Sequence, residues 1–292
     1  MVEQLGLIGC GLIGGSFSLA LKKAKLVKRV VGYSKSPSTT ERAKQLGAID
    51  VAAPSALLAV SGADLVLIAV PVSASEATFK AIRHGISDGT LVMDVGSTKG
   101  DVIEAARRGL QEQFGCFVPA HPIAGKEVSG IEHAEAGLFK GRQVVLTPVK
   151  ATRRSLVQTA TRTWTAVGAD VVQMTHEDHD SAFAAVSHLP HLLAFAFING
   201  IAGQENGERF MRLAGPGFRD FSRIAAGDPT MWRDVLLANR EQVLAQARGF
   251  REALESLELM VATGDAQGLE NAIESARRVR SQWQPGGAMS AD

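Results

Sequence analysis

The chain has 292 residues, of which 46% are hydrophobic and 21% charged, and its formal net charge is +1. This composition supplies material for a sizeable core and excludes a globally disordered chain. The balanced charge argues against a large nucleic-acid-binding surface, which needs a clear excess of Lys and Arg. The two cysteines, Cys10 and Cys116, exclude a disulfide scaffold and fit a reducing compartment.

The N-terminus begins almost directly with the apolar run Leu5–Ile8 and lacks the charged, apolar and cleavage regions of a signal peptide, in that order. No stretch reaches about 18 uninterrupted apolar residues, the length that predicts a membrane span. We therefore expect a cytoplasmic protein with no membrane partner.

Short apolar runs alternate with helical patterns through the first half of the chain, which is typical of a parallel sheet covered by helices. Strands are predicted at Gln4–Ile8, Arg29–Tyr33, Leu65–Val70, Leu91–Val95, Cys116–Pro119 and Gln143–Pro148. Helices are predicted at Ile13–Lys23, Ser38–Leu46, Ala74–His84, Lys99–Gly109 and Arg153–Val167. Two strands, Leu65–Val70 and Leu91–Val95, are nearly continuous apolar, as in strands buried on both faces.

From about Thr175 onward the strand signals vanish. Helices are predicted at Asp178–Gly203, around Pro190, and then at Thr230–Thr263 and Asp265–Gln282. The change of class predicts a sheet domain over residues 1–172 and an all-helical domain over residues 173–283, with a frayed tail at 284–292.

A glycine motif, Gly9-Cys-Gly11-Leu-Ile-Gly14, follows the first predicted strand and opens the first predicted helix. In this context the glycines allow a tight turn, close approach of a pyrophosphate, and close packing of helix on strand. The fold class is therefore α/β, with an N-terminal Rossmann-type domain that binds a nicotinamide dinucleotide. The predicted cofactor-binding residues of this part of the chain are Gly9, Gly11, Leu12, Ile13, Gly14 and Val70.

The end of the second strand selects between NAD and NADP, because NAD enzymes usually place a carboxylate there against the ribose 2′-hydroxyl. Here the sequence is Ser34-Lys35-Ser36. These residues carry no charge that repels a 2′-phosphate, and their hydroxyl and ammonium groups can bind one. NADP is therefore the preferred cofactor in this prediction, with NAD as the alternative.

Four polar segments stand out in the remainder of the chain: Asp94–Gly100, His121–Gly130, His188–His191 and Gly217–Ala225. The first two follow predicted strands, and open parallel sheets bind ligands beyond the carboxyl ends of their strands. Spacing alone predicts a dehydrogenase with a histidine in its substrate site.

Taken together and in this order, these segments resemble the prephenate/arogenate (cyclohexadienyl) dehydrogenase family of tyrosine biosynthesis. The resemblance runs from Gly6 to at least Trp232 and rests on H-P-x-A-G-x-E-x-x-G, H-L-P-H and D-F-x-R-I-A. It implies oxidative decarboxylation of prephenate or arogenate, with hydride transfer to NAD(P), to give 4-hydroxyphenylpyruvate or tyrosine.

The resemblance also implies roles for individual residues. His121 would accept the proton of the substrate hydroxyl, and Ser97 would share that hydroxyl near the nicotinamide. Arg223 would bind the substrate carboxylate. The remaining residues of the substrate pocket would be His191, Lys126 and Glu127. Lys126 replaces a small or hydroxyl residue that is frequent in the family, which leaves the choice between prephenate and arogenate open.

Structural roles compete with several of these assignments. His188 is expected to be a buried, hydrogen-bonded core residue, and Ser97 can also cap the helix that begins near Lys99. Asp220 and Arg223, three apart, can form an ion pair within one helix. The histidines from His176 to His191 lack the ligand pattern of a zinc enzyme, so no metal site is predicted.

The long predicted helix Thr230–Thr263 carries many apolar residues at helical spacing, and the resemblance implies that such helices pair in a homodimer. One rival class is the β-hydroxyacid dehydrogenases, which use a lysine of the helical domain. Lys150 is the last lysine of this chain, so that rival is disfavoured. A second rival is a dinucleotide-binding redox sensor, which would need a DNA-binding element that the sequence does not show.

Overall fold

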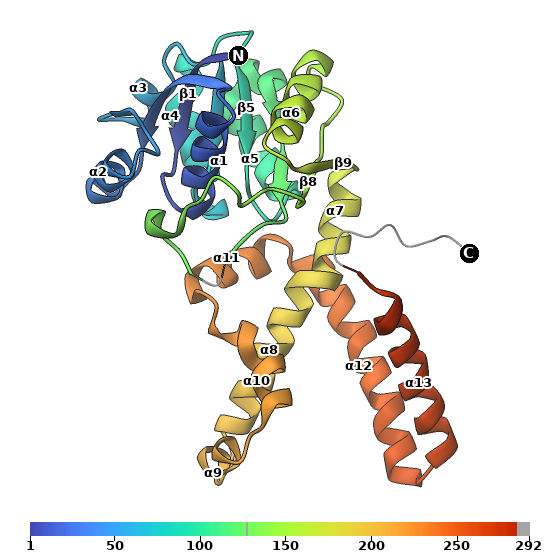
Figure 1. Ribbon diagram of the computed structural model, residues 1–292. Helices are drawn as coiled ribbons and strands as arrows, with labels where there is room; N and C mark the ends of the chain where they lie inside the picture. The colour runs from blue at the N-terminus through green and yellow to red at the C-terminus, as the bar shows by residue number, and fades with distance from the viewer. Residues whose placement is uncertain (127, 285–292) are drawn as a thin grey trace. The chain divides into compact units, whose positions relative to one another are not determined.

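A computed structural model describes residues 1–126 and 128–284 of the chain (Figure 1). The chain divides into two compact units, Met1–Asn239 and the segment that begins at Arg240. The first unit contains two sheets and the helices up to α11. The second unit contains α12 (Arg240–Thr263) and α13 (Ala266–Gln282).

A six-stranded parallel sheet forms the centre of the first unit, in the order β3-β2-β1-β4-β5-β6. Its strands are β1 (Val2–Ile8), β2 (Val27–Tyr33), β3 (Val51–Ala52), β4 (Leu65–Ile68), β5 (Leu91–Asp94) and β6 (Phe117–Val118). Every residue of β4 and β5 is buried, as their continuous apolar sequences predict. The strand order is that of a dinucleotide-binding sheet, and its direction of winding reverses between β1 and β4.

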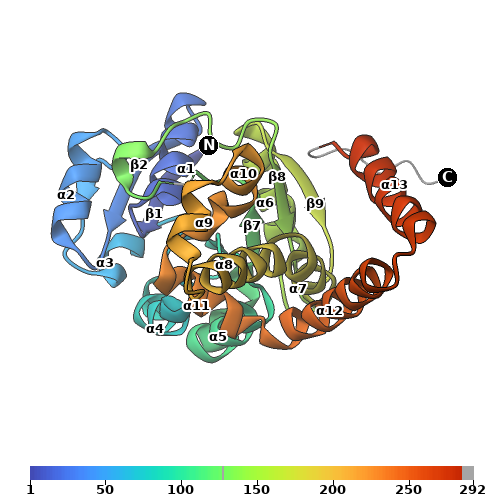
Figure 2. The same ribbon diagram turned by 90° about the horizontal axis from the view of Figure 1, so that it is seen from below.

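Helices cover both faces of this sheet. They are α1 (Leu12–Lys23), α2 (Pro37–Gln45), α3 (Ala56–Val60), α4 (Ser75–Ile82), α5 (Gly100–Leu110) and α6 (Arg154–Ala166). Figure 2 shows α1 on one side of the strands and α4 and α5 on the other. An aromatic cluster joins α1 to α6: the ring of Phe17 lies 4.6 Å from that of Trp164 and 6.3 Å from that of Phe139, centroid to centroid.

A second, three-stranded sheet contains β7 (Ala120–Pro122), β8 (Gln143–Leu146) and β9 (Asp170–Gln173) in that order. The predicted strand Gln143–Pro148 therefore forms, but it pairs with β7 and β9 and not with the main sheet. Neither β7 nor β9 was predicted. Both are short, and β9 is only partly buried, so neither has an apolar run that sequence reasoning can detect.

The helix predicted around Pro190 is continuous over 27 residues, His176–Ala202. It consists of α7 (His176–Phe183), a π-helical turn (Ala184–His188) and α8 (Leu189–Ala202). Pro190 has no N–H to donate to the preceding turn, which accounts for the wider turn just before it. By length and composition this helix is also apolar enough to cross a membrane, with a hydropathy of 1.5. Its first half, however, contains the fully buried His179, which is hydrogen-bonded to groups of the sheet domain.

Three shorter helices follow: α9 (Gly207–Arg212), α10 (Pro216–Ser222) and α11 (Pro229–Ala238). The single helix predicted over Thr230–Thr263 is wrong, because the chain breaks at Asn239 into α11 and α12. The buried Asn239 side chain donates a hydrogen bond of 2.7 Å to the carbonyl of Asp180. This hydrogen bond ties the end of α11 to α7. The apolar periodicity of the sequence does not reveal the break between α11 and α12.

Candidate active site

The loop between β1 and α1 has the geometry that its glycines predict. Gly9 has a φ of +93°, and a Cβ there would lie 2.1 Å from the carbonyl oxygen of Ala69. A Cβ on Gly14 would lie 2.2 Å from the carbonyl oxygen of Gly9. A Cβ on Gly11, in contrast, would meet no atom within 4 Å. Two glycines are therefore required by packing, and the third leaves open space at the N-terminus of α1, where a pyrophosphate fits.

Ser34, which follows β2, contacts this loop directly. The Ser34 hydroxyl oxygen accepts a hydrogen bond of 2.8 Å from the N–H of Cys10, inside the glycine motif. Lys35 and Ser36 are exposed, and Ser36 precedes the first residue of α2. The half-buried residues Leu12, Ile13 and Val70 line the same end of the sheet, at the start of α1 and just after β4.

A buried ion pair fixes the start of β7, and with it His121. Lys99 and Asp94 are paired, and their side chains are 0% and 3% exposed. The Lys99 ammonium also donates to the carbonyl of Ala120 at 2.8 Å, and the Ala120 N–H donates to Asp94 at 2.9 Å. The end of β5, the start of α5 and β7 are thus held together one residue before His121.

His121 lies on β7 and faces a second histidine from α7. Its Nδ1 lies 2.8 Å from Nε2 of His179, and Nδ1 of His179 lies 2.8 Å from a carboxylate oxygen of Asp180. Burial lowers the pKa of His121 well below its usual value, and the neighbouring His179 and Lys99 act in the same direction. Burial likewise lowers the pKa of His179. Both imidazoles are therefore neutral near pH 7, which a general base requires.

Ser97 lies half-buried in the connection between β5 and α5. The first free N–H groups of α5 donate elsewhere: those of Lys99 and Gly100 reach the Asp180 carboxylate at 2.9 and 2.8 Å. Asp180, from α7, thus fills the capping role considered for Ser97. Burial alone would raise the pKa of Asp180, but the hydrogen bonds from His179 and these two N–H groups outweigh it and lower that pKa.

The helical segments place His191 and Trp232 against each other. Their rings are stacked, with centroids 3.6 Å apart, and Nδ1 of His191 donates to the carbonyl of Ser187 at 2.8 Å. Burial lowers the pKa of His191, and the charge of Arg223 lowers it further. Arg223 begins a short 3-10 turn after α10. His188 is the buried, hydrogen-bonded residue that was predicted, at 1% exposed with Nδ1 3.2 Å from the Asn239 amide.

Two predicted substrate-pocket residues remain. The Lys126 ammonium pairs with Glu135 at 3.1 Å and donates to the carbonyl of His133 at 2.9 Å. Glu127 lies outside the described residues. Asp220 pairs with its neighbour Arg219 at 3.1 Å.

Sequence reasoning missed the residues that support His121 from behind. These are Asp94 and Lys99, which belong to the polar segment Asp94–Gly100 but received no role from the sequence, and His179 and Asp180. One signal for the first pair was available, because an Asp at the end of an apolar strand must be paired when it is buried. His179 and Asp180 carried no such signal, since only the fold brings them to His121. Among the described residues, no three His, Cys, Asp or Glu side chains are grouped to hold a metal ion.

The parallel sheet, its strand order and the glycine loop together define a dinucleotide-binding protein of the Rossmann type. The nucleotide-binding domain of prephenate dehydrogenase matches residues 17–173, and the dimerization domain of prephenate dehydrogenase matches residues 175–275. The chain belongs to the prephenate dehydrogenase family.

Individual relatives are similar over nearly the whole chain. A prephenate dehydrogenase of Bacillus subtilis is 34% identical, over 96% of this chain and 76% of the relative. A cyclohexadienyl dehydrogenase of Zymomonas mobilis is 32% identical, over 95% of both chains. The crystal structure of Aquifex aeolicus prephenate dehydrogenase with hydroxyphenyl propionate and NAD+ is similar at a TM-score of 0.91 and 33% identity, over 96% of this chain and 98% of that one.

Proposed function

We propose that this protein oxidises and decarboxylates prephenate, arogenate or both, with a nicotinamide dinucleotide as the hydride acceptor. The observation that carries the proposal is the position of His121. It is a neutral histidine at the sheet end that also carries the glycine loop, and it has one ring nitrogen already engaged by His179. Membership of the prephenate dehydrogenase family and the NAD+ complex of the Aquifex aeolicus relative support the same chemistry.

The residues of this chain have three tasks in that reaction. His121 accepts the proton of the ring hydroxyl at Nε2 as that oxygen becomes carbonyl-like, and returns it to the oxygen when loss of carbon dioxide leaves a phenol. Arg223 binds a substrate carboxylate, a task that suits a planar guanidinium, and His191 lines the pocket against Trp232. Ser97 hydrogen-bonds to the same hydroxyl. A bound nicotinamide would supply the hydride acceptor for the ring carbon, and loss of carbon dioxide with aromatisation would make the reaction irreversible.

The choice of substrate is tested by initial rates of cofactor reduction, with prephenate and arogenate each combined with NAD and NADP. We expect turnover with at least one substrate. The proposal assigns Lys126 to the substrate's side-chain end, where a cation favours a side-chain carboxylate. Absence of turnover in all four combinations, from folded protein that binds the cofactor, would contradict the proposal.

NADP is the preferred cofactor in this proposal. Ser34, Lys35 and Ser36 offer hydroxyl and ammonium groups and no carboxylate to the ribose 2′-position, and two of the three side chains are exposed. The substitution Ser34→Asp places a negative charge there. We expect it to lower kcat/KM for NADP relative to NAD by about tenfold or more, which corresponds to about 1.4 kcal/mol. An unchanged ratio of the two values in Ser34→Asp would remove Ser34 from this role.

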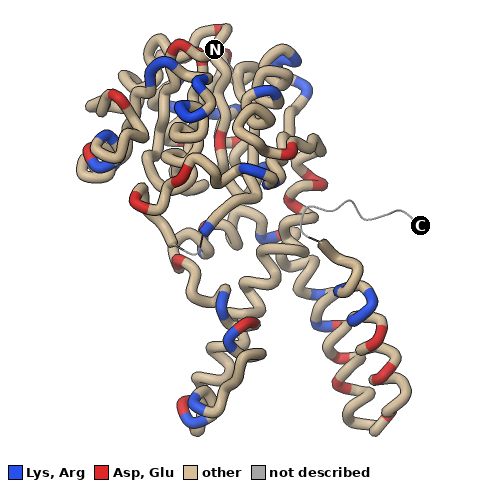
Figure 3. Tube along the Cα trace, in the orientation of Figure 1, with Lys and Arg blue, Asp and Glu red and all other residues tan. Residues whose placement is uncertain are grey.

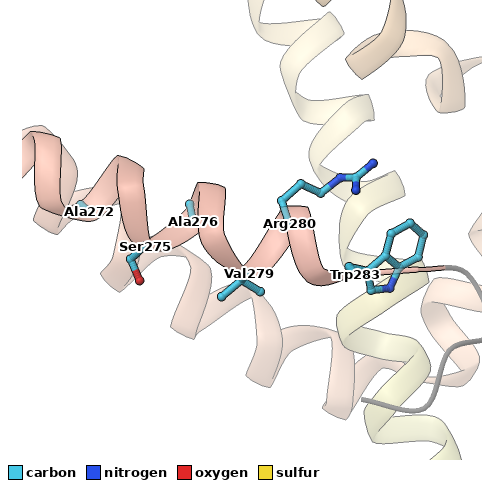
Figure 4. A pocket seen from close by; sticks show the side chains of 6 residues that line it. All are labelled: Ala272, Ser275, Ala276, Val279, Arg280 and Trp283. Carbon is cyan, nitrogen blue, oxygen red and sulfur yellow. The ribbon is translucent and has the colours of Figure 1, made fainter. Parts of the chain in front are cut away.

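We further propose that the protein is a homodimer whose helices cover one another. The helix α8 contains no Asp, Glu, Lys or Arg, and the colouring of the trace in Figure 3 shows basic and acidic positions interspersed along α12 and α13. In α13 no residue is buried, although Ile273 and Val279 are large and apolar, and Trp283, which follows the helix, is exposed as well. Figure 4 shows the shallow groove that Ala272, Ser275, Ala276, Val279, Arg280 and Trp283 line along this helix. An apolar surface of this kind needs a partner, and the matching dimerization domain supports a second copy of the chain.

A further inference from the structure

His121 is held from behind by a side chain that the sequence does not associate with it. His179 lies 58 residues further along, on α7, and is fully buried. The two rings approach edge to face, with centroids 5.1 Å apart. The Phe183 ring packs on both, with centroids 4.7 Å from His121 and 4.5 Å from His179. The contact between His121 and His179 is therefore part of the packed interior.

The positions of the protons on His179 and His121 can be deduced from Asp180, at the other end of the hydrogen-bonded chain. Asp180 accepts hydrogen bonds from His179 and from the N–H groups of Lys99 and Gly100. An ionised carboxylate only accepts, so the His179 Nδ1 at 2.8 Å must carry a proton. In a neutral imidazole the other nitrogen is then an acceptor.

The same reasoning continues to His121. Because Nε2 of His179 accepts, Nδ1 of His121 must donate across the 2.8 Å contact. Neutral His121 then has its lone pair at Nε2, the nitrogen that is to receive the substrate proton. The opposite tautomer would place two lone pairs against each other in a buried contact, which is costly.

We propose that His179 is a positioning residue, anchored by Asp180, that holds His121 in the tautomer with Nε2 unprotonated. The proposal rests on the proposed function of His121 as the proton acceptor. The arrangement also links two parts of the fold, because the carboxylate that orients His179 caps α5, the helix that follows Ser97. One anionic side chain thus orients the histidine pair and fixes the helix that follows the proposed cofactor-side serine.

Burial and the charges around the pair keep it neutral until it reacts. Burial is the main cause of the lowered pKa of His121, and the neighbouring titratable groups His179, Lys99 and His188 lower it further. Burial lowers the pKa of His188 to about 4, so His188 is itself neutral at pH 7. The Lys99 charge is neutralised by Asp94, and Asp94 and Asp180 both act to raise the pKa of His179. Once His121 is protonated, its Nδ1–H points along the neutral His179 toward the Asp180 carboxylate.

The test uses two substitutions, of which one keeps a hydrogen-bond acceptor and the other removes it. The amide oxygen of His179→Gln replaces the ring Nε2 as a hydrogen-bond acceptor, whereas His179→Phe keeps an aromatic ring beside Phe183 and removes the acceptor. The matched control is His176→Gln, on the same helix one turn earlier, where the side chain is partly exposed and pairs with Glu177.

The first readout is the nitrogen NMR spectrum of the ligand-free, full-length protein labelled at histidine. We expect Nδ1 of His121 to be protonated in the wild type, in His179→Gln and in His176→Gln, and the proton to redistribute to Nε2 in His179→Phe. A wild-type spectrum with His121 protonated at Nε2 would overturn the proposal without any variant, so a folding failure of His179→Phe leaves it testable.

The second readout is steady-state turnover. We expect His179→Phe to lower kcat by about 10²-fold with KM changed by less than about threefold, because the loss affects proton acceptance and not substrate binding. His179→Gln should recover most of kcat, and His176→Gln should equal the wild type. Equal kcat in wild type and His179→Phe would overturn the positioning role. Absence of turnover in the wild type would instead contradict the proposed function and would leave the tautomer result standing.

Discussion

His121 lies at the point where the main sheet, the second sheet and α7 meet. The preceding residue, Ala120, is hydrogen-bonded through its N–H to Asp94 and through its carbonyl to Lys99. The His121 ring is fixed by His179. A histidine held in this way loses little conformational entropy when a substrate arrives, which favours a catalytic role over a purely structural one.

We expect His121→Ala to lower kcat by about 10²–10⁴-fold with the fold intact, the range for loss of a positioned acid–base group. Turnover is measured under saturating substrate, and circular dichroism verifies folding. The control is His84→Ala, since His84 is exposed and precedes β5, toward the amino ends of the parallel strands and opposite the site. Wild-type kcat in His121→Ala would remove His121 from the reaction.

His188 makes stability depend on pH. Its folded pKa of about 4 lies below the unfolded value of 6.5, because burial disfavours the charged ring. The unfolded chain therefore binds the proton first, and the free energy of unfolding falls as the pH drops from 6.5 to 4. We expect a loss of at most about 3.5 kcal/mol from this residue, at about 1.4 kcal/mol per pKa unit.

Denaturant unfolding at several pH values measures this loss, in the wild type and in His188→Gln. The variant should have a shallower dependence, although His121 and His179 contribute in the same direction. Identical pH dependence in the two proteins would show that His188 is not held neutral by the fold.

In the loop between β1 and α1, Gly9 is required for packing, whereas Gly11 leaves room for a ligand. We expect Gly9→Ala to lower the free energy of unfolding by roughly 2–4 kcal/mol, because it combines a positive φ with a clash against Ala69. Gly11→Ala meets open space and should change the free energy of unfolding by less than about 1 kcal/mol. Its methyl group would instead occupy the proposed pyrophosphate position.

Calorimetric titration with NADP and NAD checks this contrast. Gly11→Ala should raise the cofactor Kd by about tenfold or more, which corresponds to about 1.4 kcal/mol. Normal cofactor affinity in Gly11→Ala would place the pyrophosphate elsewhere.

The elements that sequence predicted best are those with the strongest periodicity. The strands β1, β2, β4 and β5 and the helices α1 and α5 were predicted within a few residues, because long apolar runs and the glycine motif define them. The short β3, β7 and β9 were missed, since two to four residues carry no period. Likewise, the motif identified His121, but His179 and Asp180 become its neighbours only through the packing of α7.

At the scale of the whole molecule, the uncovered apolar surface of α13 predicts dimerisation through this helix. We expect Val279→Asp to weaken the dimer, because Val279 is 61% exposed in one chain and a charge there is costly only when a partner covers it. Ser281→Asp, on the same helix and exposed, is the control. Light scattering over a range of concentrations gives the mass; a monomeric wild type at every concentration would contradict the dimer.

The coupling of oxidation to decarboxylation is tested most directly by the stoichiometry of one reaction. Prephenate and, separately, arogenate are incubated with the full-length protein and NADP or NAD, and carbon dioxide and reduced cofactor are measured together. We predict one carbon dioxide released for each cofactor reduced, with an aromatic product. Cofactor reduction with the substrate carboxylate retained would indicate a simple alcohol dehydrogenase of the β-hydroxyacid type, and the proposed function would be wrong.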